Sequence, residues 1–106
     1  MRTQVCIIGG GPSGLLLSQL LHLSGIDSVV VERHARDRVL SRIRAGVLEW
    51  GTVGMLEKAG IGRRMQAQGF PHSGIRLAAR NHGFRIDFDA LIGRRIMVYG
   101  QTEVTR

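Results

Sequence analysis

The sequence predicts an α/β fold organised around a parallel strand–helix–strand unit. An apolar run at residues 5–8 ends in the pattern Gly9-x-Gly11-x-x-Gly14, and a leucine-rich helical pattern follows directly. A second apolar run ends in Glu32. The order of strand, glycine turn, helix, strand and acid is typical of a Rossmann-like nucleotide-binding unit.

Each glycine of this pattern has a physical task in a dinucleotide site. Gly9 allows the tight turn, Gly11 lets the backbone approach a pyrophosphate, and Gly14 lets the helix pack closely on the strand. The helix N-terminus presents N–H groups and a positive dipole end to phosphates. Glu32, 18 residues after Gly14, is placed to accept hydrogen bonds from an adenosine ribose. The alternative, a glycine-rich turn without a ligand, leaves this carboxylate unexplained.

The length of 106 residues allows at most one domain, and we expect that domain to be incomplete. A doubly wound sheet uses about four or more parallel strands, whereas only two are evident in the sequence. Residues 101–106 have the pattern of the first turns of a helix, which is too short to be stable alone. We therefore expect a partial, N-terminal nucleotide-binding domain over residues 1–106.

The formal net charge is +7, and almost all of the basic residues are arginine. Clustered cations occur in nucleic-acid-binding proteins and also around nucleotide cofactors. The sequence has no aromatics interleaved with the arginines and no recognisable nucleic-acid module, and some basic residues are next to the glycine pattern. We therefore expect a nucleotide cofactor and no nucleic-acid partner.

Cysteine and histidine usage exclude several other classes of protein. The single cysteine, Cys6, is in the first strand, where we expect it to be a small buried residue. With one cysteine the chain forms no internal disulfide, which fits a reducing cytoplasm. The four histidines lack metal-ligand spacing, so we expect no metal. The leucine-rich segment is too short and too polar to cross a membrane, so we expect no membrane partner.

Hydrophobic periodicity and turn residues define the expected elements. They are a strand at 3–9, a helix from Pro12 to a Gly25 cap, a strand at 28–32, a basic loop at 33–38, a helix at 47–59, a short helix at 61–68, a break at 70–72, strands at 73–79, 84–89 and 96–99, and a helix beginning at 101. The first strand is apolar on both faces and the first helix is rich in leucine, so we expect both to be buried. The strands at 73–79 and 84–89 alternate and form an antiparallel hairpin with one wet face.

Arg42 and Arg44 are the second informative feature. In an extended segment, residues at i and i+2 point the same way, so the two guanidinium groups would form a clamp for phosphates or other anions. A surface loop with solvated arginines is the alternative. The residues alone leave both interpretations open.

The chain contains no recognisable Ser-His-Asp or Cys-His set and no paired carboxylate motif. An enzyme of this kind would therefore depend on its cofactor for the difficult chemistry. The glycine pattern alone leaves FAD and NAD(P) open. The chain continues through the arginine loop and a helix into an antiparallel hairpin rather than into another parallel unit, and this favours FAD.

Four segments of the sequence resemble the 4-hydroxybenzoate 3-monooxygenase family of class A flavoprotein aromatic hydroxylases. The most specific are the Arg-Ile-Arg-Ala-Gly-Val-Leu-Glu string at 42–49 and the Tyr-Gly-Gln-Thr-Glu-Val string at 99–104, together with residues 9–17 and 31–33. The similarity extends over essentially the whole chain. It implies that the chain corresponds to about the N-terminal quarter of such an enzyme, with 3–32 as the core unit, 33–69 as the flavin loop and helices, 73–99 as antiparallel strands and 101–106 as a truncated helix.

The resemblance also implies roles for individual residues. The glycine turn and Ser13 would hold the FAD pyrophosphate, Glu32 the adenosine ribose and Arg42 the diphosphate region. The residues expected beside the flavin are Arg44, Ala45, Gly46 and Val47. Arg44 would also help to receive the nicotinamide nucleotide, and it is the one residue that we assign to catalysis. Gln101 would contact FAD. Arg33 begins the 33–38 segment, which in this family is linked to nicotinamide preference and here suits NADPH.

Such enzymes use NADPH and O2 to convert 4-hydroxybenzoate to 3,4-dihydroxybenzoate. The expected partners are therefore a small phenolic acid and O2, and the resemblance leaves a homodimer open for the full-length form. Two alternatives remain, an FAD-dependent hydroxylase of another phenolic substrate and a non-catalytic FAD-binding fragment. The residues that would bind the substrate are outside this chain, so we expect the 106-residue piece alone to be inactive.

Overall fold

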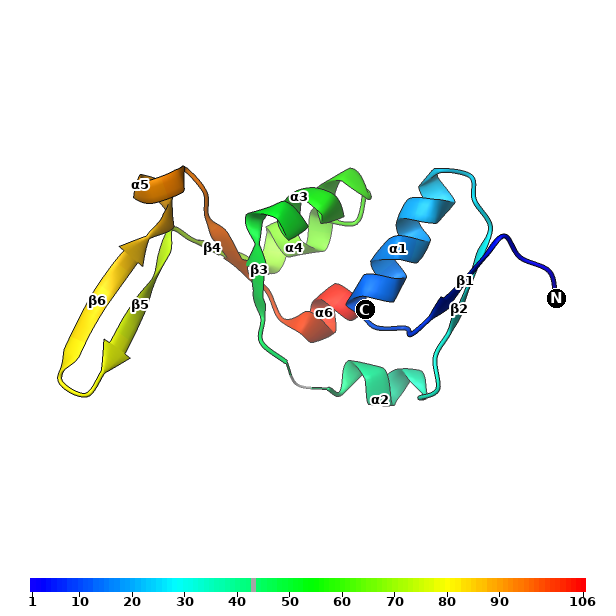
Figure 1. Cartoon of the computed structure of the whole chain (residues 1–106), viewed down its shortest axis with the longest axis horizontal. Helices are drawn as coiled ribbons and strands as arrows, with labels where there is room; N and C mark the ends of the chain where they lie inside the picture. Colours follow the sequence, from blue (N-terminus) through cyan, green and yellow to red (C-terminus); the bar gives the residue numbers. More distant parts are fainter. Residues whose placement is uncertain (43) are drawn as a thin grey trace.

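The computed structural model describes residues 1–42 and 44–106 and has a mixed α/β architecture, as the sequence predicts. The molecule is elongated, with extents of 59 × 28 × 21 Å. The hairpin formed by β5 (Gly74–Ala79) and β6 (His82–Asp87) projects from the remainder (Figure 1). The described strands form three separate sheets, two of two strands and one of three.

The first sheet is the predicted parallel unit. β1 (Val5–Ile8) pairs in parallel with β2 (Ser28–Val31), and α1 (Pro12–Leu23) connects them. Proline suits the first turn of α1, where its missing N–H would have no partner in the helix. The backbone N–H of Gly25, in the left-handed region at φ 69°, donates to His22 O at 3.0 Å as the chain leaves the helix. The predicted strand and helix positions are confirmed here.

The expected burial of this unit is wrong for the chain as described. Cys6 is exposed, Ile8 is 91% exposed, and no residue of α1 is fully buried. The reason is that β1 and β2 form a sheet of only two strands with α1 packed on it. Apolar side chains that are typical of a doubly covered parallel sheet therefore face solvent.

Two further expectations are wrong in the central sheet. The predicted helix at 47–59 begins instead with a strand, β3 (Val47–Glu49), followed by α3 (Trp50–Lys58). The predicted break at 70–72 is β4 (Phe70–His72). Both strands pair antiparallel with β7 (Ile96–Val98), in the order β3-β7-β4. Both segments are strands because they pair with β7, which is distant in sequence from β3 and β4. Pro71 is tolerated because β4 is an edge strand.

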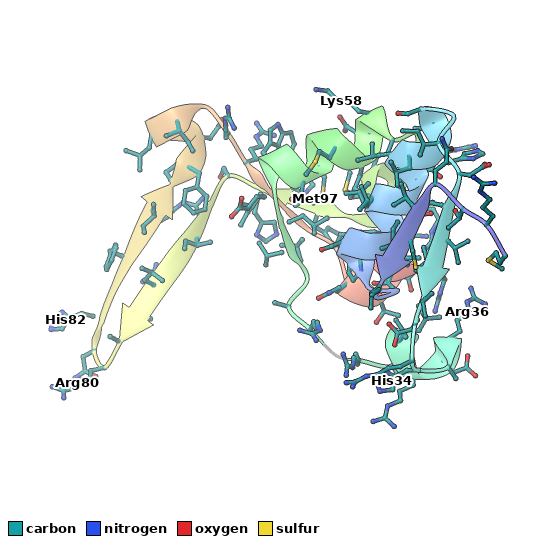
Figure 2. All side chains as sticks on the ribbon, turned by 45° about the vertical axis from the view of Figure 1, so that its right-hand side comes forward. His34, Arg36, Lys58, Arg80, His82 and Met97 are labelled. Atoms are coloured by element: carbon teal, nitrogen blue, oxygen red, sulfur yellow. The ribbon has the colours of Figure 1, made fainter. Side chains whose placement is uncertain are left out.

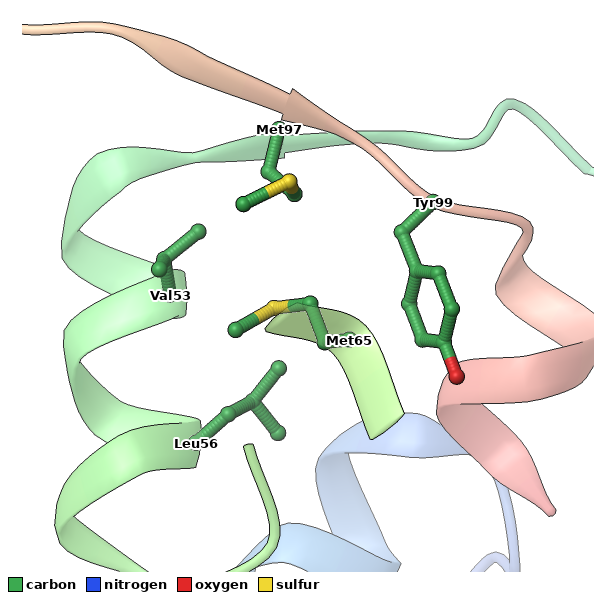
Figure 3. Close-up of a cluster of buried hydrophobic side chains, with 5 residues drawn as sticks. All are labelled: Val53, Leu56, Met65, Met97 and Tyr99. Atoms are coloured by element: carbon green, nitrogen blue, oxygen red, sulfur yellow. The ribbon is translucent and has the colours of Figure 1, made fainter. Parts of the chain in front are cut away.

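The main hydrophobic core lies where the helices cover this central sheet. Five buried residues form it, from α3, α4 (Arg63–Gln68), β7 and the residue after β7: Val53, Leu56, Met65, Met97 and Tyr99 (Figure 3). The partly buried Leu16 of α1 packs against the same cluster. The core therefore attaches the parallel unit to the central sheet.

The antiparallel hairpin forms as predicted, but its second strand begins and ends two residues earlier than expected, and Leu77 and Phe84, expected on the covered face of the hairpin, are exposed. β6 ends at Asp87, and α5 (Phe88–Ile92) follows where a strand was expected to continue to residue 89. The Asp87 carboxylate accepts a hydrogen bond from Ala90 N at 3.0 Å, which caps α5, and Gly93 ends it in the left-handed conformation. This capping pattern outweighs the alternation of Phe84, Ile86 and Phe88.

Two short helices border the region that contains the glycine turn. α2 (Arg36–Leu40) occupies part of the segment expected to be a loop, and α6 (Gln101–Thr105) forms where a helix was expected to begin. Thr102 Oγ1 donates to Leu40 O at 3.0 Å and joins the two helices. Among the described residues, no helix is both long enough and apolar enough to cross a membrane.

Candidate functional site

The glycine turn brings α1 into direct contact with the end of β1. Gly9 adopts φ 114°, which an L side chain rarely adopts. A Cβ added to Gly14 would lie 2.0 Å from Gly9 O, so only glycine fits at this position. Gly9 N donates to Val31 O at 2.8 Å and ties the turn to the end of β2. These contacts place the N-terminus of α1 beside the end of both strands.

Gly11 differs from its neighbours because nothing among the described residues requires glycine there. It is the N-cap of α1, its backbone is extended at φ −78° and ψ −178°, and an added Cβ would meet no described atom within 4 Å. Within the described part of the chain, no side chain caps this end of α1. The first-turn N–H groups therefore face open space that a ligand oxygen can enter.

Glu32 lies across the turn and bonds to it. One carboxylate oxygen, Oε2, accepts from Gly10 N at 2.9 Å, and the other, Oε1, accepts from His34 N at 2.9 Å. His34 Nδ1 lies 3.0 Å from Oε1. The Gly10 and His34 backbone N–H groups, in that order, lower the pKa of Glu32 from 4.5 to about 2. The carboxylate is therefore ionised at neutral pH.

A cleft of about 350 Å³ opens at this point and gathers most of the polar residues predicted for the site. From the predicted set its lining includes Gly11, Ser13, Glu32, Arg42, Arg44 and Gln101. They come from the glycine turn, the end of β2, the arginine loop and α6. Ile43, between the two arginines, lies outside the described residues. The structure thus brings together residues that are far apart in the sequence.

The segment after the arginines is held against the end of β7. Tyr99 N donates to Gly46 O at 2.7 Å, and an added Cβ on Gly46 would lie 3.1 Å from both Tyr99 O and Gly100 Cα. This close approach requires a very small residue. Ala45 and Val47, on either side of Gly46, line a larger neighbouring cleft of about 1110 Å³.

Not every predicted residue faces a cleft. Gly9, Gly14, Gly46 and Arg33 line neither of the two, and Arg33 is exposed beyond the end of β2. Sequence reasoning also missed His34, which is labelled in Figure 2. It lines both clefts and forms a hydrogen bond with Glu32. Its position two residues after the acid was the one available signal. In the described residues, no group of three His, Cys, Asp or Glu side chains could hold a metal ion.

Comparison with known proteins decides the family. The family model described as FAD binding domain matches residues 2–106. The chain belongs to the FAD binding domain family.

A protein named as a hydroxylase is among the relatives of this chain. The p-hydroxybenzoate hydroxylase of Acinetobacter baylyi is 51% identical over 107 aligned residues, which cover 100% of this chain and 26% of that protein. The chain therefore spans about a quarter of the length of this curated relative.

Solved structures share the fold. The p-nitrophenol 4-monooxygenase PnpA of Pseudomonas putida has a TM-score of 0.81 at 21% identity, covering 95% of this chain and 27% of that one. A Klebsiella pneumoniae HpxO variant complexed with FAD has a TM-score of 0.70 at 24% identity, covering 99% and 28%. At these identities the likeness establishes the fold of the FAD binding domain.

The donor groups around the smaller cleft suit the chemical groups of FAD. The uncapped N-terminus of α1 and two arginines offer N–H groups and positive charge, which suit a diphosphate. An ionised carboxylate suits ribose hydroxyls, and the space at Gly11 would be filled by a Cβ. The larger cleft is lined mainly by apolar side chains, which suit a planar ring system.

Substitution by alanine should have different effects at Gly11 and at Gly14, the last two glycines of the pattern. Gly14→Ala should lower the free energy of unfolding by about 3 kcal/mol because its Cβ meets Gly9 O. Gly11→Ala should change it by less than about 1 kcal/mol yet weaken FAD binding about tenfold or more, because its Cβ fills ligand space. Urea denaturation and flavin titration measure the two effects. Equal loss of stability in both variants would contradict the assignment.

The lowered pKa of Glu32 predicts a pH-dependent contribution to stability. Because the folded-state pKa is below 4.5, the ionised carboxylate stabilises the fold above pH 4.5, and this contribution is lost as pH falls from 4.5 to about 2. The stability difference between the unmodified protein and Glu32→Gln, measured by urea denaturation, should therefore shrink between pH 5 and pH 3. A difference that stays constant over this range would contradict the hydrogen-bonding pattern.

Proposed function

We propose that the chain is the FAD-holding N-terminal part of a flavoprotein monooxygenase that hydroxylates 4-hydroxybenzoate to 3,4-dihydroxybenzoate with NADPH and O2. The observation that carries the proposal is the convergence of the glycine turn, Glu32, the two arginines and Gln101 on one cleft. The 51% identity to p-hydroxybenzoate hydroxylase across the whole chain supports the substrate class.

Different residues would bind different parts of FAD. The glycine turn and Ser13 receive the pyrophosphate at the N-terminus of α1, and Arg42 adds charge to the diphosphate. Glu32 accepts from the adenosine ribose. Arg44, Ala45, Gly46 and Val47 pass beside the flavin, and Gln101 contacts the cofactor from α6.

FAD, when bound, supplies the redox chemistry and the activation of O2. The protein groups bind and orient. The carbonyl of Gly46 accepts a hydrogen bond from Tyr99 N, just after β7. The backbone of residues 44–47, which would lie beside the flavin ring, therefore has a defined position. Arg44 lines the open cleft, where its guanidinium would also receive an incoming nicotinamide nucleotide.

A hydroxylase of another phenolic compound is the second candidate. The protein named p-nitrophenol 4-monooxygenase shares this fold, so the fold serves more than one substrate. In both candidates the partners are a small phenolic compound and O2. For the intact protein we retain the predictions of no nucleic-acid or membrane partner, a reducing cytoplasm as compartment, and a homodimer left open.

The full-length protein tests the proposed function directly. It should purify yellow, with flavin absorbance, and should consume NADPH rapidly only when 4-hydroxybenzoate is added, giving 3,4-dihydroxybenzoate by chromatography. Another phenolic acid as the preferred substrate would favour the second candidate. A colourless protein that gains no flavin from added FAD would refute both.

The 106-residue piece should behave differently from the intact enzyme. We expect weak FAD binding, because the cleft is open to solvent, and no hydroxylation. Flavin fluorescence quenching and product chromatography measure the two properties. Conversion of 4-hydroxybenzoate by this piece alone would contradict the proposal that catalysis needs further residues.

The basic segment after Glu32 predicts a preference for NADPH over NADH. Arg33, Arg36 and Arg38 are exposed in the segment that follows Glu32, and guanidinium groups suit the additional 2′-phosphate. We expect a higher kcat/KM with NADPH than with NADH. The double variant Arg33→Gln with Arg38→Gln should lower kcat/KM for NADPH about tenfold and should change kcat/KM for NADH little. An equal or higher kcat/KM with NADH in the unmodified enzyme would contradict this.

A further inference from the structure

His34 occupies one whole side of the Glu32 carboxylate. Oε1 accepts from the backbone N–H of His34 at 2.9 Å and lies 3.0 Å from Nδ1 of the same residue. A carboxylate only accepts hydrogen bonds, so Nδ1 carries the proton in this contact. The two side chains are 19% and 26% exposed for His34 and Glu32, so the contact is partly protected from water.

The number of acceptor positions determines what remains for a ligand. A carboxylate has two oxygens and about four acceptor positions. The two donors of His34 use both positions of Oε1, and Gly10 N uses one position of Oε2 at 2.9 Å. One position, on Oε2, is left. Glu32 therefore presents a single oxygen to a hydroxyl group.

The cleft around Glu32 also contains two arginines, which compete with His34 for the Glu32 carboxylate. Arg42 and Arg44 line the same cleft as Glu32 and His34. Arginine and carboxylate form strong paired hydrogen bonds when both oxygens are accessible. In the described residues, the side-chain hydrogen-bond partner of Glu32 is His34. By occupying Oε1, His34 keeps Glu32 from pairing with Arg42 or Arg44. These arginines then stay available for phosphate.

We propose that His34 is a positioning residue that fixes the Glu32 carboxylate so that Oε2 receives an adenosine ribose hydroxyl. The inference rests on the proposed role of Glu32 in holding FAD. His34 acts through Glu32 and not by direct contact with the ribose. Loss of its ring donor frees Oε1, and the carboxylate then turns or pairs with an arginine.

The test compares two substitutions of similar size in the apoprotein of the full-length enzyme. His34→Asn keeps a side-chain N–H donor close to the position of Nδ1, and His34→Leu removes it. The probes are ADP and 2′,3′-dideoxy-ADP, whose affinities are measured by calorimetry. We expect the preference of the unmodified apoprotein for ADP to fall about tenfold in His34→Leu and to be largely retained in His34→Asn. His82→Leu, at the tip of the distant hairpin (Figure 2), is the matched control and should keep the full preference.

Each outcome supports or overturns the inference. A merely structural role would weaken both nucleotides equally, and this result, or a full preference for ADP in His34→Leu, would overturn it. Thermal unfolding identifies a variant that does not fold, and His34→Ala then replaces His34→Leu. Glu32→Ala separates the two proposals. If it retains the preference for ADP, the proposed role of Glu32 fails, whereas loss of preference in Glu32→Ala but not in His34→Leu overturns the role of His34 alone.

Discussion

The close approach of α1 to β1 is the constraint on which the site depends. Gly14 faces the carbonyl of Gly9 so closely that a single added carbon would lie 2.0 Å from the oxygen. Because of this contact, the N-terminus of α1 lies at the end of both parallel strands, where Glu32 can reach Gly10 N. The N-terminal end of α1 and the Glu32 carboxylate are therefore brought together by one backbone contact.

A second contact of the same kind places the remaining half of the site. Gly46 O accepts from Tyr99 N, and its missing side chain lets the chain lie against Gly100. The arginine loop before Gly46 and α6 after Gly100 are thus brought to the same cleft. Thr102 adds a tie from α6 to the end of α2. Polar backbone contacts position the walls of this cleft, whereas Met65 and Tyr99 of the buried cluster line the larger neighbouring cleft.

Three of the errors in the sequence-based expectations share a physical cause. Val47 and Leu48 fit a helical stripe, but pairing with Val98 and Met97 places them in β3. Phe70 begins a strand for the same reason. Cys6 was expected to be buried because apolar strands usually have cover on both faces, and the two-stranded sheet does not supply it. In each case the outcome depends on a partner that is distant in sequence, which local periodicity does not encode.

The sequence by itself determined the parallel unit, its glycine turn, the acid that follows β2, and the helix α1 with proline at its start and glycine after its end. These features depend on neighbours within a few residues, through backbone conformations that Gly9 and Gly25 allow. Only the tertiary structure decided which residues share the cleft, that Arg33 lies outside it, and that His34 holds one oxygen of Glu32. The reason is that side-chain direction and hydrogen-bond partners are set by packing between distant segments, and the spacing of residues along the chain does not specify them.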